Sequence, residues 1–212
     1  MNYPVIVLGA GGHAKVLINA LQLLSVELLG VTDADVGKRG QLLLDVPVTG
    51  DDETIMKYPA ETIRLVNGIG SVRVSPRRRQ LFEHFKSRGY HFAGVVHPSA
   101  IIATDVVCAE GVQIMAGAVI QPGCRIGLNA VINTGCIVDH DCHIGDHVHI
   151  SPGVTLSGGV RVGENAHVGT GATVIQGVQI GRDSLVAAGA VVIRDVPDGA
   201  TVIGVPAKEV NV

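Results

Sequence analysis

One apolar position recurs every six residues through the second half of this chain of 212 residues. Its sixteen consecutive members run from Ile102 to Val192, and none of them is polar. A second ladder of small or β-branched residues lies two positions before the first, from Ala100 to Ala190, and only Ser184 interrupts its apolar character. A period of six is neither helical (about 3.6) nor that of a plain strand (about 2), so the unit is a repeat.

Short strands joined by corners satisfy such a repeat. Three strands and three corners make one coil of about eighteen residues, and coils stack at the inter-strand spacing of about 4.8 Å. The sequence therefore predicts a parallel β-helix of roughly five coils over residues 96–194, with the first ladder inside the prism. Burial of each interior Ile or Val contributes about 1.5–3 kcal/mol. An aliphatic core of this kind fits a chain with three Phe, three Tyr and no Trp.

The N-terminal segment has the pattern of a nucleotide-binding turn between a strand and a helix. The apolar run Val5–Leu8 leads into Gly9-Ala10-Gly11-Gly12-His13-Ala14, which fits G-x-G-x-x-A and opens a helical pattern that ends near Leu24. Glycines at such a turn let backbone N–H groups approach a phosphate at the helix N-terminus. A second strand is predicted over residues 27–32, and Asp33 at its end is placed to meet a ribose or base hydroxyl. The alternative is a tight turn that holds no ligand.

The rest of the first 95 residues is less strongly patterned. Residues 36–62 show no clear periodicity, whereas further strands are predicted over 63–66 and 91–96. We expect residues 1–95 to form a Rossmann-like α/β domain that is large enough for one nucleotide and too small for a dinucleotide. Residues 195–212 are expected to form a C-terminal extension that caps the last coil.

A cluster of arginines follows a predicted helix start. Ser75-Pro76 has the form of an N-cap followed by the first helical residue. Arg77, Arg78 and Arg79 then occupy the first turn, where the helix dipole disfavours positive charge. We interpret them as a solvated basic face, with a bound anion as the alternative.

Composition narrows the class of protein. A net charge of −3 and 17% charged residues argue against a nucleic-acid-binding protein. No run of about eighteen apolar residues exists, and the N-terminus lacks the basic segment of a signal peptide, so we expect a cytoplasmic protein without membrane insertion. All four cysteines fall on the two ladders, which predicts small, buried, free thiols in a reducing compartment: Cys108, Cys124, Cys136 and Cys142.

Histidines are clustered in the repeat region, where four occur within ten residues: His140, His143, His147 and His149. His140 lies at a corner between Asp139 and Asp141, where other corners prefer Gly or Asn. An imidazole beside carboxylates can serve as a general base, although a lone corner histidine is often only polar surface. His143 and His149 point outward, and His167 lies one coil above His149. Outward histidines of this kind leave a His₃ zinc site as a second interpretation.

The combination of motifs resembles the sugar O- and N-acetyltransferases of the sialic-acid-acetylating and bacillosamine-pathway type. The resemblance covers nearly the whole chain and is carried by the glycine turn at Gly9–His13, the hexapeptide ladders, Asn133-Thr134 followed by Val138-Asp139-His140-Asp141-Cys142, and Gly204-Val205-Pro206-Ala207-Lys208. It implies an N-terminal Rossmann-like domain and a left-handed β-helix. It also implies a homotrimer that binds acetyl-CoA between neighbouring β-helices, with no metal, and a nucleotide-activated sugar held by the N-terminal domain.

The resemblance also implies roles for individual residues. His140 matches the general base and Asp141 the carboxylate that orients it. The residues that match positions near acetyl-CoA are His149, which would steady the oxyanion of the thioester, Thr170 and Ala188. Those that match substrate contacts are Gly11, Gly12, His13, Asp33, Gly68 and, within the Asn133-Thr134 motif, Asn133.

The function implied is acetyl transfer from acetyl-CoA to the 4-amino group of a nucleotide-activated 4-amino-4,6-dideoxy sugar in bacterial glycan biosynthesis, directly and with His140 as base. A UDP-linked sugar is favoured. Ala34 replaces an Asp found in some UDP-binding relatives, which leaves GDP or dTDP open. The nearest alternative is O-acetylation of a sugar hydroxyl of the sialic-acid type. A zinc enzyme resembling the γ-carbonic anhydrases, an NAD oxidoreductase and a non-catalytic scaffold are weaker alternatives, because none of them accounts for both halves of the chain.

Overall fold

The computed structural model describes residues 3–71, 74 and 76–210. The chain divides into two compact units, the first formed by Met1–Gly70 and Pro76–Pro98 and the second by Ser71–Ser75 and Ser99–Val212. The predicted N-cap at Ser75 lies outside the described residues. No helix in the described part of the chain is long and apolar enough to cross a membrane.

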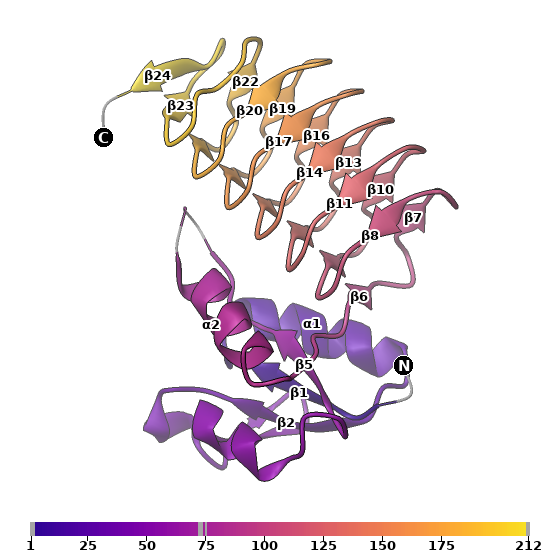
Figure 1. Cartoon of the computed structure of the whole chain (residues 1–212), viewed down its shortest axis with the longest axis vertical. Helices are drawn as coiled ribbons and strands as arrows, with labels where there is room; N and C mark the ends of the chain where they lie inside the picture. The colour runs from indigo at the N-terminus through magenta and orange to yellow at the C-terminus, as the bar shows by residue number, and fades with distance from the viewer. Residues whose placement is uncertain (1–2, 72–73, 75, 211–212) are drawn as a thin grey trace. The chain divides into compact units, whose positions relative to one another are not determined.

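The first unit is a small α/β domain around a mostly parallel sheet in the order β3-β4-β2-β1-β5 (Figure 1). Its elements are β1 (Val5–Leu8), α1 (Gly12–Leu23), β2 (Leu28–Thr32), η1 (Val36–Lys38), β3 (Leu42–Leu43), β4 (Val46–Gly50), η2 (Asp52–Lys57), β5 (Arg64–Asn67), α2 (Pro76–Lys86) and β6 (Val95–Val96). Strand β1 is buried over its whole length because β2 and β5 pair with it in parallel on both sides. Such a strand is expected to be apolar throughout, as β1 is.

Helix α1 packs through one apolar face. It begins after Gly11 in extended conformation, and its buried residues include Ala14, Leu17, Ile18 and Leu21. This spacing places the four side chains on one stripe of the helix. The sequence therefore predicts both the strand and the helix that flank the glycine turn.

Two sequence expectations for this unit are corrected by the structure. The stretch 36–62, expected to be irregular, contains a hairpin of β3 and β4 and two short 3₁₀ helices. Strand β3 has only two residues, and β4 alternates buried and more exposed positions but contains Pro47 and Gly50, which are depleted in strands. The predicted strand over residues 91–96 is ordered as β6 only at Val95–Val96, with one isolated bridge between Leu65 and Phe92.

The second unit is a left-handed parallel β-helix in which sixteen two-residue strands follow one another at six-residue intervals (Figure 1). One sheet contains β7 (Ile101–Ile102), β10 (Val119–Ile120), β13 (Ile137–Val138), β16 (Thr155–Leu156), β19 (Thr173–Val174) and β22 (Val191–Val192). The next contains β8 (Val107–Cys108), β11 (Arg125–Ile126), β14 (His143–Ile144), β17 (Arg161–Val162) and β20 (Gln179–Ile180). The third contains β9 (Gln113–Ile114), β12 (Val131–Ile132), β15 (His149–Ile150), β18 (His167–Val168) and β21 (Leu185–Val186), and it ends on β23 (Thr201–Ile203) and β24 (Lys208–Val210).

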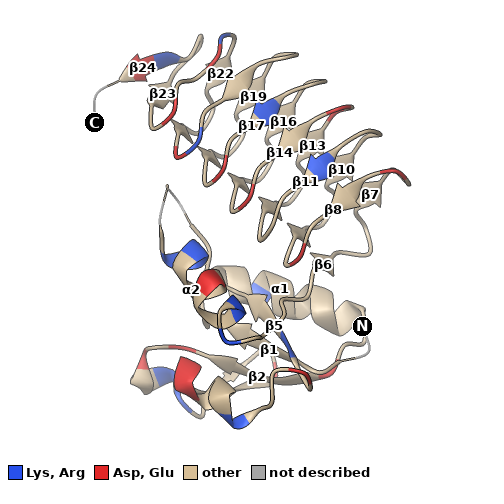
Figure 2. Ribbon diagram, viewed as in Figure 1, with Lys and Arg blue, Asp and Glu red and all other residues tan. Residues whose placement is uncertain are grey.

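Both ladders fill the interior of the prism, as the period predicts. From Ile114 to Val192, every member of the first ladder belongs to one buried core. Coils stack in register at eighteen residues, for example Val138 against Ile120 and against Leu156. Charged residues of this unit consequently lie at outer strand positions, at the corners and in the C-terminal extension (Figure 2).

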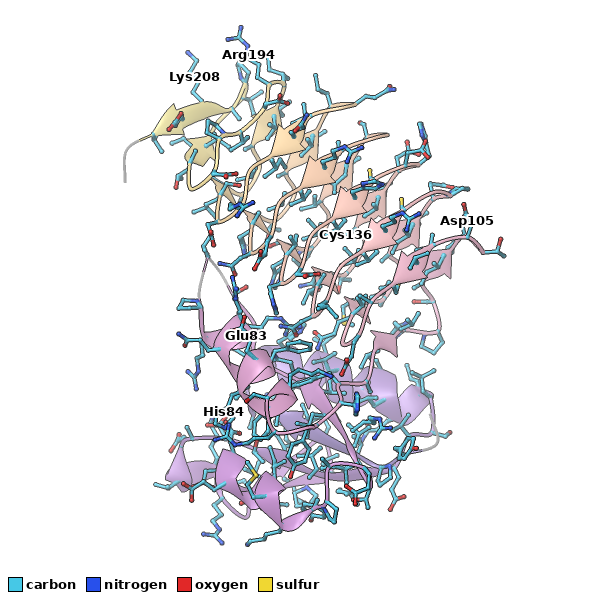
Figure 3. The ribbon with its side chains drawn as sticks, viewed as in Figure 1. Glu83, His84, Asp105, Cys136, Arg194 and Lys208 are labelled. Atoms are coloured by element: carbon cyan, nitrogen blue, oxygen red, sulfur yellow. The ribbon has the colours of Figure 1, made fainter. Side chains whose placement is uncertain are left out.

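The cysteine prediction holds for three thiols and is wrong for the fourth. Cys124, Cys136 and Cys142 are buried, whereas Cys108 is exposed. Cys108 belongs to the first coil, which has a neighbouring coil on only one side within this unit, so a core position there stays open. Burial raises the pKa of Cys136 to about 11 and that of Cys142 to about 12 (Cys136 is labelled in Figure 3). Such thiols are poor nucleophiles at neutral pH.

Candidate active site

The corner between β13 and β14 holds the predicted catalytic pair. Asp141 occupies the third corner position with φ of +59°, a conformation that Asp tolerates better than most residues. Backbone hydrogen bonds fix the corner from both sides, from Asp141 N–H to Pro122 O (2.9 Å) in the coil before and from Gly159 N–H to His140 O (2.8 Å) in the coil after. The corner is therefore a rigid base for the side chains that it carries.

The His140 imidazole is oriented by its neighbour. Its Nδ1 lies 2.8 Å from Oδ2 of Asp141, and its side chain is 54% exposed. An ionised carboxylate can only accept a hydrogen bond, so Nδ1 carries the proton and Nε2 keeps its lone pair. The hydrogen bond to Asp141, with a smaller electrostatic contribution from Asp139, raises the pKa of His140. The pair thus has the geometry of a base that is oriented by a carboxylate and whose side chain is exposed.

His149 lies on the outer face of β15 but is only 6% exposed. Its Nδ1 is 2.9 Å from Ser71 Oγ, and its Nε2 is 3.4 Å from Asn133 Nδ2. Asn133 Oδ1 accepts from Thr134 N–H (2.8 Å), which turns the Asn133 amide nitrogen towards the histidine. With the Asn133 amide nitrogen facing it, Nε2 is an acceptor, so a hydrogen bond from Nε2 to a thioester oxygen requires both displacement of the Asn133 contact and a proton on Nε2.

His167 stands one coil above His149, as the sequence predicts, with ring centroids 5.0 Å apart. Its Nε2 is 3.1 Å from Ser151 Oγ, and burial lowers the pKa of the imidazole. No group of three or more His, Cys, Asp or Glu side chains among the described residues is arranged to hold a metal ion.

A single copy of the chain does not bring all the predicted residues together. His140 and Asp141 lie on the edge between the sheet of β13 and that of β14. Asn133, Thr170 and Ala188 follow β12, β18 and β21, so they lie on the edge between the sheet of those strands and the sheet of β13. One face of the prism therefore separates the predicted base from Asn133, a predicted substrate contact, and from two of the predicted acetyl-CoA residues, Thr170 and Ala188.

The first unit contains a pocket of about 400 Å³ at the carboxyl ends of β1 and β2. Crevices at this end of a parallel sheet are where open α/β folds bind ligands. Its lining residues are Gly9, Asp33, Ala34, Asp52, Ile69, Arg77, Gln80, Leu81 and His84, the last of which is labelled on α2 in Figure 3. Sequence reasoning identified Asp33 and the glycine turn, but missed Asp52, Gln80 and His84, which come from segments without a recognisable motif.

Asp33 braces the glycine turn. Its Oδ2 accepts from Ala10 N–H (2.7 Å) and from Lys38 Nζ (2.9 Å), and its Oδ1 accepts from Asp35 N–H (2.9 Å). Burial by itself would raise the pKa of Asp33, but these hydrogen bonds outweigh burial and hold it below the ordinary value. The carboxylate is therefore kept ionised in the lining of the pocket.

The remaining predicted contacts of this unit surround the same turn. Gly11 and Gly12 open α1 and have space around their Cα atoms, which suits close approach of a ligand, and His13 follows them in the first turn of α1. Gly68 has a structural reason to be glycine, since a Cβ there would lie 2.7 Å from the carbonyl oxygen of Leu8.

The arginine cluster differs from its expected solvated face. Arg78 is only 4% exposed, and its guanidinium donates to the carbonyl oxygens of Asn67 and Ile69, each at 2.9 Å. Burial lowers its pKa to about 9. Arg79 pairs with Glu83 on the exposed side of α2 (2.7 Å), while Arg77 lines the pocket. The three arginines thus have three different environments.

The fold combines an α/β domain of the nucleotide-binding type with a hexapeptide-repeat β-helix, an architecture of acyltransferases. Comparison with known families agrees, since residues 4–85 match the PglD N-terminal domain and residues 159–194 match the bacterial transferase hexapeptide repeat. The chain belongs to the sugar N-acetyltransferases of the hexapeptide transferase family.

Solved structures similar to the chain carry this identification. PerB from Caulobacter crescentus, in complex with CoA and GDP-perosamine, is 41% identical with a TM-score of 0.91, over 100% of this chain and 99% of that one. The acetyltransferase domain of PglB from Neisseria gonorrhoeae, in complex with acetyl coenzyme A, is 34% identical with a TM-score of 0.91, over 99% and 100%. WeeI from Acinetobacter baumannii is 27% identical with a TM-score of 0.88, over 99% and 100%. A search of curated protein sequences gave no match.

Proposed function

We propose that this protein transfers the acetyl group of acetyl-CoA to the 4-amino group of a nucleotide-linked 4-amino-4,6-dideoxy sugar in bacterial glycan biosynthesis, in the cytoplasm. The observation that carries the proposal is the oriented imidazole of His140, whose Nδ1 is 2.8 Å from Oδ2 of Asp141 and whose side chain is 54% exposed. The similarity to enzymes solved with CoA and with a nucleotide amino sugar supports it.

The reaction is proposed to be a direct transfer. The sugar amine attacks the thioester carbonyl, a C–N bond forms, the C–S bond breaks, and Nε2 of His140 takes the proton of the amine. The departing CoA thiolate then receives a proton from the imidazolium. Cys142, the thiol nearest to His140 in sequence, is buried and donates to Ser157 O (3.3 Å), so it is unsuited to carry an acetyl intermediate.

The nucleotide is proposed to bind in the pocket beside Asp33. The sequence favours UDP, and this remains a prediction. The relatives solved with GDP-perosamine, together with Ala34 in the pocket wall, make a GDP-linked sugar the first substrate to assay. His149, Thr170 and Ala188 remain the proposed contacts for acetyl-CoA, and Gly11, Gly12, His13, Gly68 and Asn133 remain proposed contacts for the sugar nucleotide.

A homotrimer is proposed because one chain places the base and the acetyl-CoA residues on different edges of the prism. The face between those edges carries exposed apolar side chains, including Ile101 (67% exposed) and Ile137 (43%). Contact between copies at this face would bury these side chains and bring His140 of one copy towards the acetyl-CoA edge of the next.

The test is an acetyl-transfer assay with acetyl-CoA against GDP-, UDP- and dTDP-linked 4-amino sugars and against sialic acid, with the product analysed by mass spectrometry. His140→Ala is expected to fold and to lose about 10²–10⁴ in kcat. His147→Asn is the matched control, because Asn129 and Asn165 occupy the same corner position one coil before and one coil after. Acetylation of sialic acid alone, or near-normal turnover by His140→Ala, would contradict the proposal.

A further inference from the structure

The corner directly above His140 differs from every other corner of the β-helix. Sixteen residues lie two positions after a core residue, from Thr104 to Arg194, and only Gly158 among them has no side chain. Gly158 follows His140 by one coil of eighteen residues, so the two occupy equivalent positions in successive coils. The single glycine among these sixteen positions is therefore the residue that faces the predicted base.

The backbone does not explain this glycine. Gly158 does not have a positive φ, whereas its neighbour Gly159 has φ of +68° and lies where every corner has Gly or a residue that tolerates a left-handed conformation. The same corner position is occupied by alanine at Ala116 and Ala188. An alanine is thus compatible with the conformation of the corner.

The imidazole explains it. A Cβ placed on Gly158 would lie 2.5 Å from Cε1 and 2.5 Å from Nε2 of His140, and 3.1 Å from Cδ2. The ring therefore rests against the Cα of Gly158, which carries no side chain. Gly158 is buried, whereas His140 is exposed. Its Nδ1 is at the same time bound to Asp141 on its own corner.

We propose that Gly158 is a positioning residue for His140: it forms the seat against which the imidazole lies, so that the ring can bind Asp141 while Nε2 stays at the substrate side. The inference rests on the proposed function of His140 as general base. It adds that the orientation of the base depends on the next coil as well as on its neighbouring carboxylate.

The expected effect of a methyl group at position 158 follows from what it meets. Its three nearest atoms are the outer atoms of the His140 ring, which can rotate away about χ1 and χ2, so the backbone need not move. Rotation separates Nδ1 from Asp141 and moves Nε2 by about 1 Å, the difference between the 2.5 Å contact and an ordinary contact of about 3.5 Å. A misplacement of about 1 Å can cost about 10²-fold in rate. We expect Gly158→Ala to fold, to keep its KM values within about twofold and to lose about 10²-fold in kcat.

The experiment compares Gly158→Ala, His140→Ala and the double variant with the parent protein, and uses Gln176→Ala as the control that puts alanine at the same corner one coil further on. Steady-state kinetics give kcat and KM, and an NMR titration follows the His140 Cε1–H signal without depending on activity. The expected result is a lower pKa for His140 in Gly158→Ala, because the hydrogen bond to Asp141 is lost, and no further loss of kcat when Gly158→Ala is added to His140→Ala.

Three outcomes would overturn the inference. An unchanged pKa of His140 in Gly158→Ala would show that the position of the ring does not depend on contact with Gly158. A Gly158→Ala protein that fails to fold while the double variant also fails would show that the methyl meets the backbone and not the ring. Near-normal turnover of His140→Ala would refute the base assignment and with it the catalytic part of the inference. This result is distinguishable from a failure of the Gly158 contact, because the NMR titration reports the position of the His140 ring independently of activity.

Discussion

The stacking of the coils depends on a column of glycines at one edge of the prism: Gly127, Gly145, Gly163 and Gly181. At Gly163 an added Cβ would lie 2.5 Å from the backbone nitrogen of Arg182, 2.8 Å from the carbonyl carbon of Gly181 and 2.9 Å from the Cα of Arg182. All three are backbone atoms of the next coil, so no side chain can rotate to make room. Gly163→Ala is therefore predicted to destabilise the β-helix.

The size of the effect follows from these distances. Ordinary carbon contacts are about 3.5–4.0 Å, so the next coil would have to recede by about 1 Å. That movement would stretch the backbone hydrogen bond from Gly163 N–H to Ile180 O, now 2.7 Å, beyond hydrogen-bonding range. Overpacking of this kind costs about 1–3 kcal/mol, and we expect the upper end because the obstacle is fixed. For a chain of this size, about 3 kcal/mol corresponds to a fall in Tm of about 6–12 °C.

The assay is thermal unfolding followed by circular dichroism or calorimetry at one fixed protein concentration, because any assembly makes Tm depend on concentration. Gly158→Ala is the matched control, since the three atoms nearest to its methyl belong to the His140 side chain and not to the backbone, and its Tm is expected to stay within about 2 °C of the parent. A Gly163→Ala protein that melts as the parent does would refute the reasoning that coil spacing is set by backbone contact at this edge.

Three further predictions concern the site and the core. Asp141→Asn is expected to lower the pKa of His140, because the Asp141 carboxylate now raises it. Activity is lost at low pH as the base becomes protonated, so this acidic limb of the kcat–pH profile should shift to lower pH. A limb that does not move would contradict the role of Asp141. Asp33→Ala frees the Ala10 N–H and should raise KM for the sugar nucleotide by about tenfold with KM for acetyl-CoA unchanged, and equal changes in both would argue against a nucleotide site there. Ile132→Ala, at a fully buried core position, is expected to lower the free energy of unfolding by about 2–5 kcal/mol in denaturant titration, and a loss below about 1 kcal/mol would be inconsistent with a tightly packed prism.

Local patterns predicted most of the architecture. The ladders placed sixteen strands and their eighteen-residue register, because in a β-helix each residue meets its own equivalent in the next coil and the period alone fixes the pairing. The turn at Gly9–Gly12 likewise predicted β1, α1 and the position of Asp33. The hairpin of β3 and β4 was missed because β3 has only two residues and β4, which pairs with both β3 and β2, contains Pro47 and Gly50, so its order depends on tertiary contacts more than on a strand-forming sequence.

The environment of individual side chains was decided at long range. Nothing in the sequence around Arg78 distinguishes it from Arg77 and Arg79, yet Arg78 alone turns inward, because the carbonyls of Asn67 and Ile69 are there to receive it. Cys108 has a core position in the repeat but stays exposed, because its coil is the first. His149 has an outward position but is buried against Ser71 and Asn133.

The sequence by itself determined the prism, its core and the identity of the corner that holds His140, since a strict period leaves each residue only one place in the coil. Only the tertiary structure decided that the imidazole binds Asp141 and rests against Gly158. The physical reason is that periodicity fixes the direction of a side chain from the backbone, whereas burial and hydrogen bonding depend on atoms that the fold brings in from other coils and segments.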